Sequence, residues 1–224
     1  MLDTAYLMLG SVFAYLIVLV VIAEGLGELP QTGPEITRKI VHIGAGNVML
    51  LAWWFAIPRW MILVASAIAG IVALVSYFLP ILPSINSVGR QSLGTFFYAV
   101  SIGVVSTLFV PPHFAFAVVG ILVMAWGDGL AAVFGQRWGR HPYQVLGNRK
   151  SWEGSATMTI ASTAVTGLTL GGAFGFSLEV SLIAVAVGAI ATLLEAISQW
   201  GIDNLTVPLG SAGASFVLAQ WLLG

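Results

Sequence analysis

Apolar runs about as long as a membrane-spanning helix dominate this chain, for example over residues 7–23, 61–79 and 114–126. Charged residues make up 8% of the sequence, whereas a soluble domain carries roughly 25%. Runs of this kind leave no surface suited to water, and helices satisfy their own backbone hydrogen bonds within lipid. The sequence therefore predicts an all-α, polytopic membrane bundle that forms one domain over residues 1–224.

At about 20 residues per span, eight transmembrane helices are expected. They cover residues 5–24, 38–57, 60–79, 93–110, 113–134, 155–174, 178–198 and 205–223. The count falls to seven if Pro58, or Pro111 with Pro112, marks a kink within a helix and not its end. The N-terminus lacks the basic segment of a cleaved signal peptide, so the first run is expected to remain as a span.

The charges gather on one side of this eight-helix arrangement. Seven of the eight basic residues fall in the loops after the first, third, fifth and seventh helices, or at the adjoining helix ends. They are Arg38, Lys39, Arg90, Arg137, Arg140, Arg149 and Lys150. The positive-inside rule assigns this face to the cytoplasm and both termini to the other side. The net charge of −1 argues against a nucleic-acid partner, which would need a basic face.

Most of the acidic residues lie on the same face, and the positive-inside rule does not explain them. They are Glu24, Glu28, Glu35, Asp128, Glu153, Glu195 and Asp203. Residues 126–157 alone hold six of the chain's 17 charged residues. Charge is costly beside hydrocarbon and needs a reason there. Two carboxylates flanking four cations among glycines could hold a phosphate chain and its divalent metal.

Asp128 lies near the cytoplasmic end of the fifth expected helix. Gly127, Ala131 and Gly135 follow one another at four-residue spacing beside it, and small residues at that spacing let a second helix approach closely. One interpretation is a magnesium ligand with backbone room for a phosphate, since magnesium needs only one or two protein carboxylates. The alternative is an interfacial aspartate within a packing motif.

The segment 148–154, NRKSWEG, precedes the sixth expected helix. Arg149 and Lys150 are adjacent cations, and Ser151 is a candidate N-cap, so cations and free helix amides could form an anion site. Glu153 could join the metal or orient Lys150. The alternative for both cations is interfacial anchoring. The segment lacks Walker A spacing, and GDGLAA at 127–132 lies in a membrane helix, so neither common nucleotide motif applies.

Two further polar groups flank the apolar helices. RKIVH at 38–42 places Arg38 and His42 four residues apart on one helix face, with Lys39 on an adjacent face; phosphate contact or membrane anchoring would explain it. Glu195 lies in the last turns of an apolar helix, and Asp203 and Asn204 close the hairpin into the final helix. A buried acid at Glu195 is either functional or a satisfied structural charge.

These segments together resemble the CTP-dependent lipid-alcohol kinase family, which includes dolichol kinase, phytol kinase and CTP-dependent diacylglycerol kinase. The resemblance rests on GDGLAAVFGQRWGRH at 127–141, RKSWEGS at 149–155, RKIVH, and the E-(x)7-DNLTVP pattern that begins at Glu195. It covers about residues 35–215 and is strongest to the phytol kinases of photosynthetic organisms, through GQRWGRHPYQVLG and WGIDNLTVP. A more distant similarity links the central segment to phosphatidate cytidylyltransferases, but those carry an aspartate pair where this chain has Asp128 alone.

The resemblance implies transfer of the CTP γ-phosphoryl group to a membrane prenyl alcohol such as phytol or geranylgeraniol. It implies a multi-pass protein of a bacterial or cyanobacterial plasma or thylakoid membrane, with the site facing the cytoplasm. Asp128 and Glu153 would hold Mg²⁺, and Asp203 or Glu195 would accept or orient the hydroxyl proton. The residues expected to contact the nucleotide are Lys150, Arg149, Arg137, Arg38, Lys39, His42 and Asn204.

Two other functions fit parts of the pattern. A cytidylyltransferase-like enzyme would also use CTP and magnesium, and would form a CDP-lipid in place of a lipid phosphate. A small ion-coupled transporter would carry charges near the bilayer midplane and on both sides of its barrier. Here the charges gather on one face, which favours the kinase.

Overall fold

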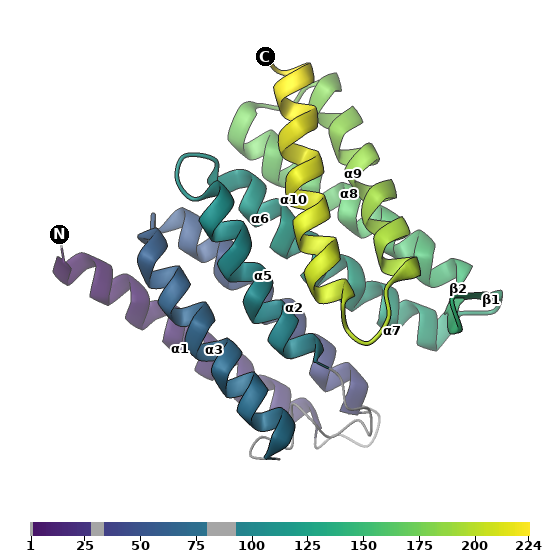
Figure 1. Ribbon diagram of the computed structural model, residues 1–224, viewed down its shortest axis with the longest axis horizontal. Helices are drawn as coiled ribbons and strands as arrows, with labels where there is room; N and C mark the ends of the chain where they lie inside the picture. Colours follow the sequence, from purple (N-terminus) through teal and green to yellow (C-terminus); the bar gives the residue numbers. More distant parts are fainter. Residues whose placement is uncertain (1, 28–33, 80–92) are drawn as a thin grey trace.

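The computed structural model describes residues 2–27, 34–79 and 93–224 (Figure 1). Within these ranges the chain forms eight helical rods, and each coincides with one expected helix. They are α1 (Leu2–Gly27), α2 (Pro34–Trp54), α3 (Arg59–Phe78), α5 (Gly94–Phe109), one rod comprising α6 (Phe114–Leu122), the π-helical turn η1 (Val123–Asp128) and α7 (Gly129–Trp138), then α8 (Trp152–Phe174), α9 (Leu178–Ile197) and α10 (Asp203–Leu222). Arg90 and Glu28 lie outside the described residues.

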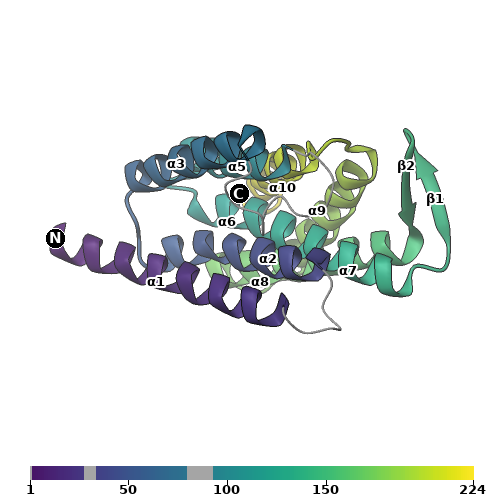
Figure 2. The same cartoon turned by 90° about the horizontal axis from the view of Figure 1, so that it is seen from below.

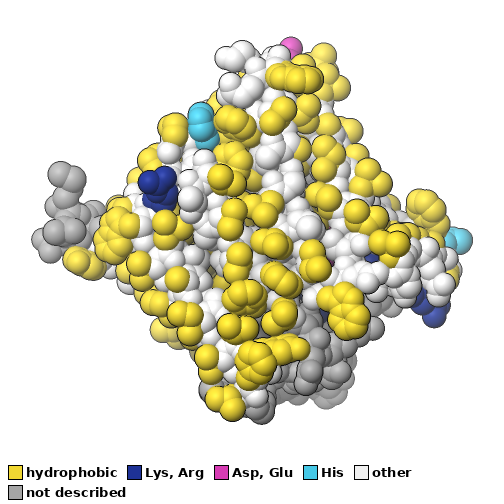
Figure 3. Space-filling model, in the orientation of Figure 1, with side chains coloured by type: hydrophobic (Ala, Val, Ile, Leu, Met, Phe, Trp, Pro, Cys, Tyr) yellow, Lys and Arg dark blue, Asp and Glu magenta, His cyan; other side chains and the backbone are white. Residues whose placement is uncertain are grey.

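The predicted all-α multi-pass membrane bundle is confirmed. In the described part of the chain, α1, α3, the rod from Phe114 to Trp138, α9 and α10 are each long and apolar enough to cross a bilayer. The face seen in Figure 3 is covered largely by apolar side chains, with few charges among them. Pro58 directly precedes α3, and Pro111 and Pro112 lie between α5 and α6, so these prolines separate helices and do not kink them.

The rod from Phe114 to Trp138 is the centre of the bundle, and most of its length is buried. Seen from below, α1, α2 and α8 lie on one side of the rod, and α3, α5 and α10 lie on the other (Figure 2). α9 packs against both α8 and α10. The π-helical turn ends at Asp128, and such turns inside α-helices are frequent at functional sites.

The predicted small-residue packing face is confirmed, and the helix that it contacts is α8. A Cβ added at Gly127 would lie 2.6 Å from Oγ of Ser162, and one at Gly135 would lie 3.4 Å from Cα of Gly154. The rod can approach α8 this closely only because these positions lack side chains. Asp128 is therefore held in a helix whose position is tightly constrained.

The connection between α7 and α8 forms an antiparallel β-hairpin, which the sequence analysis did not predict. Strands β1 (Pro142–Val145) and β2 (Asn148–Ser151) are joined by Leu146 and Gly147, whose φ angles are +49° and +84°. Two successive positive φ values match a type I′ turn, which suits the twist of a two-residue hairpin. The side chain of Ser151 accepts a hydrogen bond from the backbone N–H of Gly154 at 3.1 Å, which confirms it as the N-cap of α8.

The predicted orientation can be tested with single cysteines, because the chain has none of its own. Gln144 lies in the hairpin, at the opposite end of the bundle from Gly224 (Figure 1). A cysteine at Gln144 should be shielded from an impermeant thiol reagent in intact cells, whereas cysteines at Ser177 and Gly224 should react. A further probe position, Asn86, lies outside the described residues. Labelling at Gln144 from outside would reverse the assigned orientation.

Candidate active site

The site is organised around an ion pair between α2 and the central rod. The Nζ atom of Lys39 lies 2.5 Å from Oδ2 of Asp128, and the two side chains are 9% and 12% exposed. Two close approaches bring these helices together: a Cβ at Gly46 would lie 2.3 Å from Cβ of Ala125, and Gly129 packs against Ile43. Removing either partner of such a buried pair would leave an uncompensated charge.

His42 lies beside this pair. Its Nε2 atom is 3.8 Å from Oδ2 of Asp128, its ring hydrogen-bonds to the backbone of Met124, and the ring lies 4.7 Å from that of Tyr98. The Nε2 atom is buried and has no hydrogen-bond partner in the structure, so it could contact a bound ligand. Lys39 and His42 thus share the face that meets Asp128, whereas Arg38 is solvent-exposed. Arg38 lies four residues before His42 on the same helix, and its charge acts on the His42 ring.

Lys150 reaches the site from the hairpin. Its ammonium forms an ion pair with the carboxylate of Glu195, which is buried in the last turns of α9. Burial lowers the pKa of Lys150, but the Glu195 charge and hydrogen bond outweigh this and raise it overall. Lys150 therefore remains protonated at neutral pH. Because side chains alternate along a strand, the neighbouring Arg149 lies on the opposite, exposed face of β2, so the two cations do not act as an adjacent pair.

The start of α10 supplies another carboxylate. Oδ1 of Asp203 accepts hydrogen bonds from the backbone N–H of Asn204 at 3.0 Å and from its side-chain amide at 3.1 Å. The same amide also donates to the carbonyl of Gly201 at 3.2 Å. Asn204 thereby fixes one oxygen of Asp203 and leaves Oδ2 outside these bonds.

These groups form one polar cluster, defined by Lys39, His42, Asp128, Lys150, Glu195 and Asp203. The charge of Asp128 acts on Lys39, Lys150, Glu195 and Asp203, which places them within electrostatic range of one another. Three carboxylates and two ammonium groups carry a formal charge of −1 when His42 is neutral. A divalent cation with a phosphate chain could complement this mixed arrangement, because carboxylates bind the metal and ammonium groups bind phosphate oxygens.

Two predicted site residues, Glu153 and Arg137, have their partners outside the polar cluster. Glu153 accepts hydrogen bonds from His141, at 2.6 Å from Nδ1 and 3.3 Å from the backbone N–H, and is not among the charged neighbours of Asp128. The exposed Arg137 lies over the ring of Trp138, 5.4 Å from its centroid. The structure thus joins Glu153 to the base of the hairpin and does not bring it to Asp128.

The polar cluster offers few protein ligands for a magnesium ion. The described residues contain no group of three or more His, Cys, Asp or Glu side chains that could hold a metal ion. Magnesium usually takes one or two carboxylates, with phosphates and water as its other ligands. Lys39 contacts Oδ2 of Asp128, so Oδ1 is the oxygen of this carboxylate that could serve as such a ligand.

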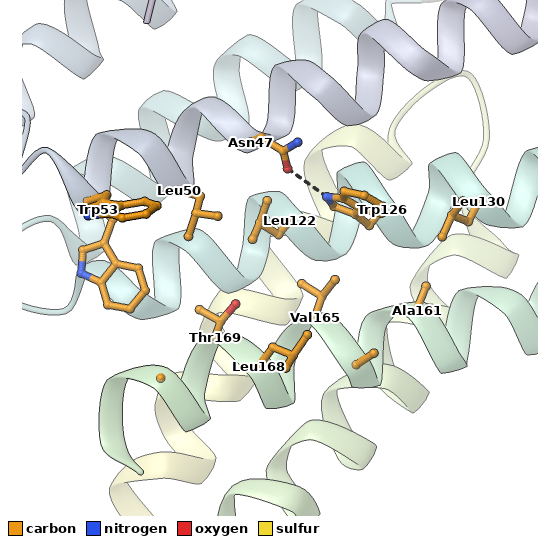
Figure 4. Close-up of a pocket in the computed structure, with 13 residues that line it drawn as sticks. Asn47, Leu50, Trp53, Leu122, Trp126, Leu130, Ala161, Val165, Leu168 and Thr169 are labelled. Carbon is orange, nitrogen blue, oxygen red and sulfur yellow. Dashed lines mark hydrogen bonds between the residues drawn. The ribbon is translucent and has the colours of Figure 1, made fainter. Parts of the chain in front are cut away.

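An apolar groove of about 990 Å³ lies on the other side of the central rod, between α2 and α8 (Figure 4). Its one described internal hydrogen bond joins Nε1 of Trp126 to Oδ1 of Asn47 at 2.9 Å. Its lining residues are Asn47, Leu50, Trp53, Trp54, Leu122, Trp126, Leu130, Ala161, Ala164, Val165, Leu168, Thr169 and Gly172. None of these residues belongs to α9 or α10, which contribute Glu195 and Asp203 to the polar cluster.

Sequence reasoning missed three features of this region. Tyr98 packs on His42 from α5, the Trp126–Asn47 hydrogen bond fixes the rod against α2, and Lys150 pairs with Glu195. The first two are a tyrosine and an asparagine within apolar helices, a signal too common to single out. The pairing of Glu195 could have been predicted in kind, because a buried glutamate requires a cationic partner.

Comparisons with known proteins find phytol kinases that match most of the chain. The chain is 55% identical to a phytol kinase of Synechocystis sp. over 208 residues, which cover 92% of this chain and 89% of that protein. It is 28% identical to phytol kinase 1, chloroplastic, of Arabidopsis thaliana, over 93% of this chain and 73% of the relative. A probable phytol kinase 2 of Oryza sativa subsp. japonica is 29% identical over 82% of this chain and 67% of the relative.

No protein-family model matches the chain, and no solved structure matches it significantly. The assignment therefore rests on the extent and identity of the sequence match. At 55% identity over nearly the whole length of both proteins, the match is sufficient to show family membership and to identify a kinase. The chain belongs to the phytol kinase family.

Proposed function

We propose that this protein transfers the γ-phosphoryl group of CTP to the hydroxyl of a membrane prenyl alcohol, with phytol and geranylgeraniol as the leading substrates. The reaction is proposed to take place at the cytoplasmic face and to require Mg²⁺. The observation that carries the proposal is the polar cluster at one end of apolar helices, where Asp128, Lys39, Lys150, Glu195 and Asp203 interact. The match to phytol kinases supplies the acceptor class.

Phosphoryl transfer asks a protein mainly to position the reactants and to neutralise charge. Lys39 and Lys150 are each paired with a carboxylate of the polar cluster. When a nucleotide binds, each ammonium is proposed to turn from its carboxylate toward phosphate oxygens, at a distance that a flexible lysine can cover. Asp128 is then released to hold the metal, which would neutralise charge on the β- and γ-phosphates.

The two remaining acids are proposed to have different roles. Glu195 is tied to Lys150, and so acts as its counter-ion and sets its resting position. Asp203 has one oxygen held by Asn204 and the other outside those bonds. We therefore assign to Asp203 the task of accepting the hydroxyl proton of the alcohol. Arg38, Arg137 and Arg149, all exposed, would contact the nucleotide from the aqueous side.

The proposal is tested with detergent-solubilised protein, labelled CTP and a panel of lipid alcohols comprising phytol, geranylgeraniol, a long polyprenol and diacylglycerol. The expected product is a lipid monophosphate, with phytol or geranylgeraniol as the best acceptor. A CDP-lipid would identify a cytidylyltransferase instead, and no product from any alcohol would contradict the assignment.

The donor preference is a separate expectation, because no base-reading motif is visible in the chain. Unlabelled CTP should compete with labelled CTP more strongly than UTP, ATP or GTP does. Stronger competition by ATP would remove CTP as the donor and leave the lipid-alcohol kinase activity in place.

A further inference from the structure

The β-hairpin is fastened to the connection between α9 and α10 by two side-chain amides. Nδ2 of Asn148 donates to the carbonyl of Ser198 at 3.0 Å. From the other side, Nε2 of Gln199 donates to the carbonyl of Leu146 in the hairpin turn. Each bond crosses between segments about 50 residues apart in the sequence, so both are tertiary contacts and neither contributes to the hairpin's own ladder.

The register of β2 links this fastening to Lys150. Asn148 and Lys150 are two residues apart on β2, so their side chains lie on the same face of the hairpin. Their cross-strand partners in β1 are Val145 and Tyr143, respectively. Their partners, Ser198 and Glu195, are three residues apart at the end of α9. The hairpin therefore meets the end of α9 at two neighbouring points, one a neutral hydrogen bond and the other the ion pair.

The connection between α9 and α10, which contacts the hairpin, is held by its own turn and hydrogen bonds. Trp200 and Gly201 have φ angles of +59° and +83°, which produce a tight turn between the two helices. The hydroxyl of Ser198 lies 3.0 Å from that of Thr206 and donates to the carbonyl of Leu194 at 2.6 Å. A hairpin fastened here is held against a segment that carries Glu195 at one end and Asp203 at the other.

We propose that Asn148 and Gln199 are positioning residues, which hold the hairpin against the α9–α10 connection so that Lys150 is presented to the phosphates of the donor. Lys150 must leave Glu195 to reach a phosphate. The two amide bonds keep the hairpin backbone in place while it does so, and the side chain alone moves. This inference rests on the proposed role of Lys150 in phosphoryl transfer.

The test uses changes of nearly equal shape that replace the amide donor with a carboxylate, and a control for the added charge. Asn148→Asp and Gln199→Glu each replace an N–H with an oxygen that faces a carbonyl, which breaks the bond and repels its partner. Each is expected to lower kcat about tenfold, equal to about 1.4 kcal/mol, with the KM for the lipid alcohol unchanged. Gln144→Glu is the matched control: it adds the same charge on the exposed face of the hairpin, and should leave kcat unchanged.

A double-mutant cycle with Lys150→Ala separates positioning from a general loss of structure. If Asn148 acts through Lys150, Asn148→Asp should have almost no further effect on kcat in the Lys150→Ala background. An equal loss in both backgrounds would overturn the proposal, as would kcat values for Asn148→Asp and Gln199→Glu that match the control. If Lys150→Ala itself were fully active, the role of Lys150 in the proposed function would be wrong, and the positioning role would fail with it.

Discussion

Asp128→Asn is expected to lower turnover by ~100-fold or more, about 2.7 kcal/mol of transition-state stabilisation. The asparagine keeps the shape of the side chain but loses the charge proposed to hold the metal. Stability should fall as well, because the ammonium of Lys39, 9% exposed, would lose its 2.5 Å partner. Activity is therefore measured per folded molecule, after size-exclusion chromatography and a thermal melt.

Two companion variants distinguish a metal ligand from a structural acid. Asp128→Glu keeps the charge and should retain measurable activity, with a higher Mg²⁺ concentration needed for half-maximal rate. The double variant Lys39→Met/Asp128→Asn removes both buried charges, so it should recover stability and remain inactive. Normal turnover in the double variant would show that Asp128 serves only to pair with Lys39. Glu179→Gln, exposed in the first turn of α9, is the control and should be silent.

Asp203→Asn is expected to have the second-largest effect, a loss in kcat of about 100-fold, as is typical when a general base is removed. Asparagine retains Oδ1, which accepts both hydrogen bonds from Asn204, so the start of α10 should keep its structure. The KM for CTP should change little, because Asp203 is assigned to the alcohol hydroxyl. The measurement is a full kinetic analysis with both substrates varied.

The comparison variant is Glu195→Gln, which removes the partner of Lys150 and leaves Asp203 intact. It should reduce kcat by about tenfold, since Lys150 would lose its resting position but could still reach a phosphate. A larger loss in Glu195→Gln than in Asp203→Asn would reverse the two assignments and make Glu195 the proton acceptor.

Much of the fold could be predicted because its causes are local. Each apolar run has the length of a span, and Pro58, Pro111 and Pro112 separate helices. The same holds for the packing face of Gly127, Ala131 and Gly135, whose spacing requires a close partner helix. The N-cap at Ser151 could also be predicted from the sequence, since an N-cap depends only on a side chain and the backbone amides that follow it.

The hairpin was missed because its turn carries Leu146 before Gly147, and leucine at a positive φ is not a usual hairpin signal. That omission had a consequence for the site. In a loop, Arg149 and Lys150 could act together as an anion site, but in a strand their side chains point to opposite faces. The strand register, and not the sequence neighbourhood, separates the half-buried Lys150 from the exposed Arg149.

The sequence by itself determined which residues are candidates for chemistry, because each charge in so apolar a chain is costly unless it has a role. Asp128, Lys150, Glu195 and Asp203 stand out on that basis alone. The tertiary structure decided their partners: Lys39 with Asp128, Lys150 with Glu195, and Glu153 with His141. Such pairings join segments up to 89 residues apart. They depend on which helices pack together and at what depth, which the spacing of residues along the chain does not specify.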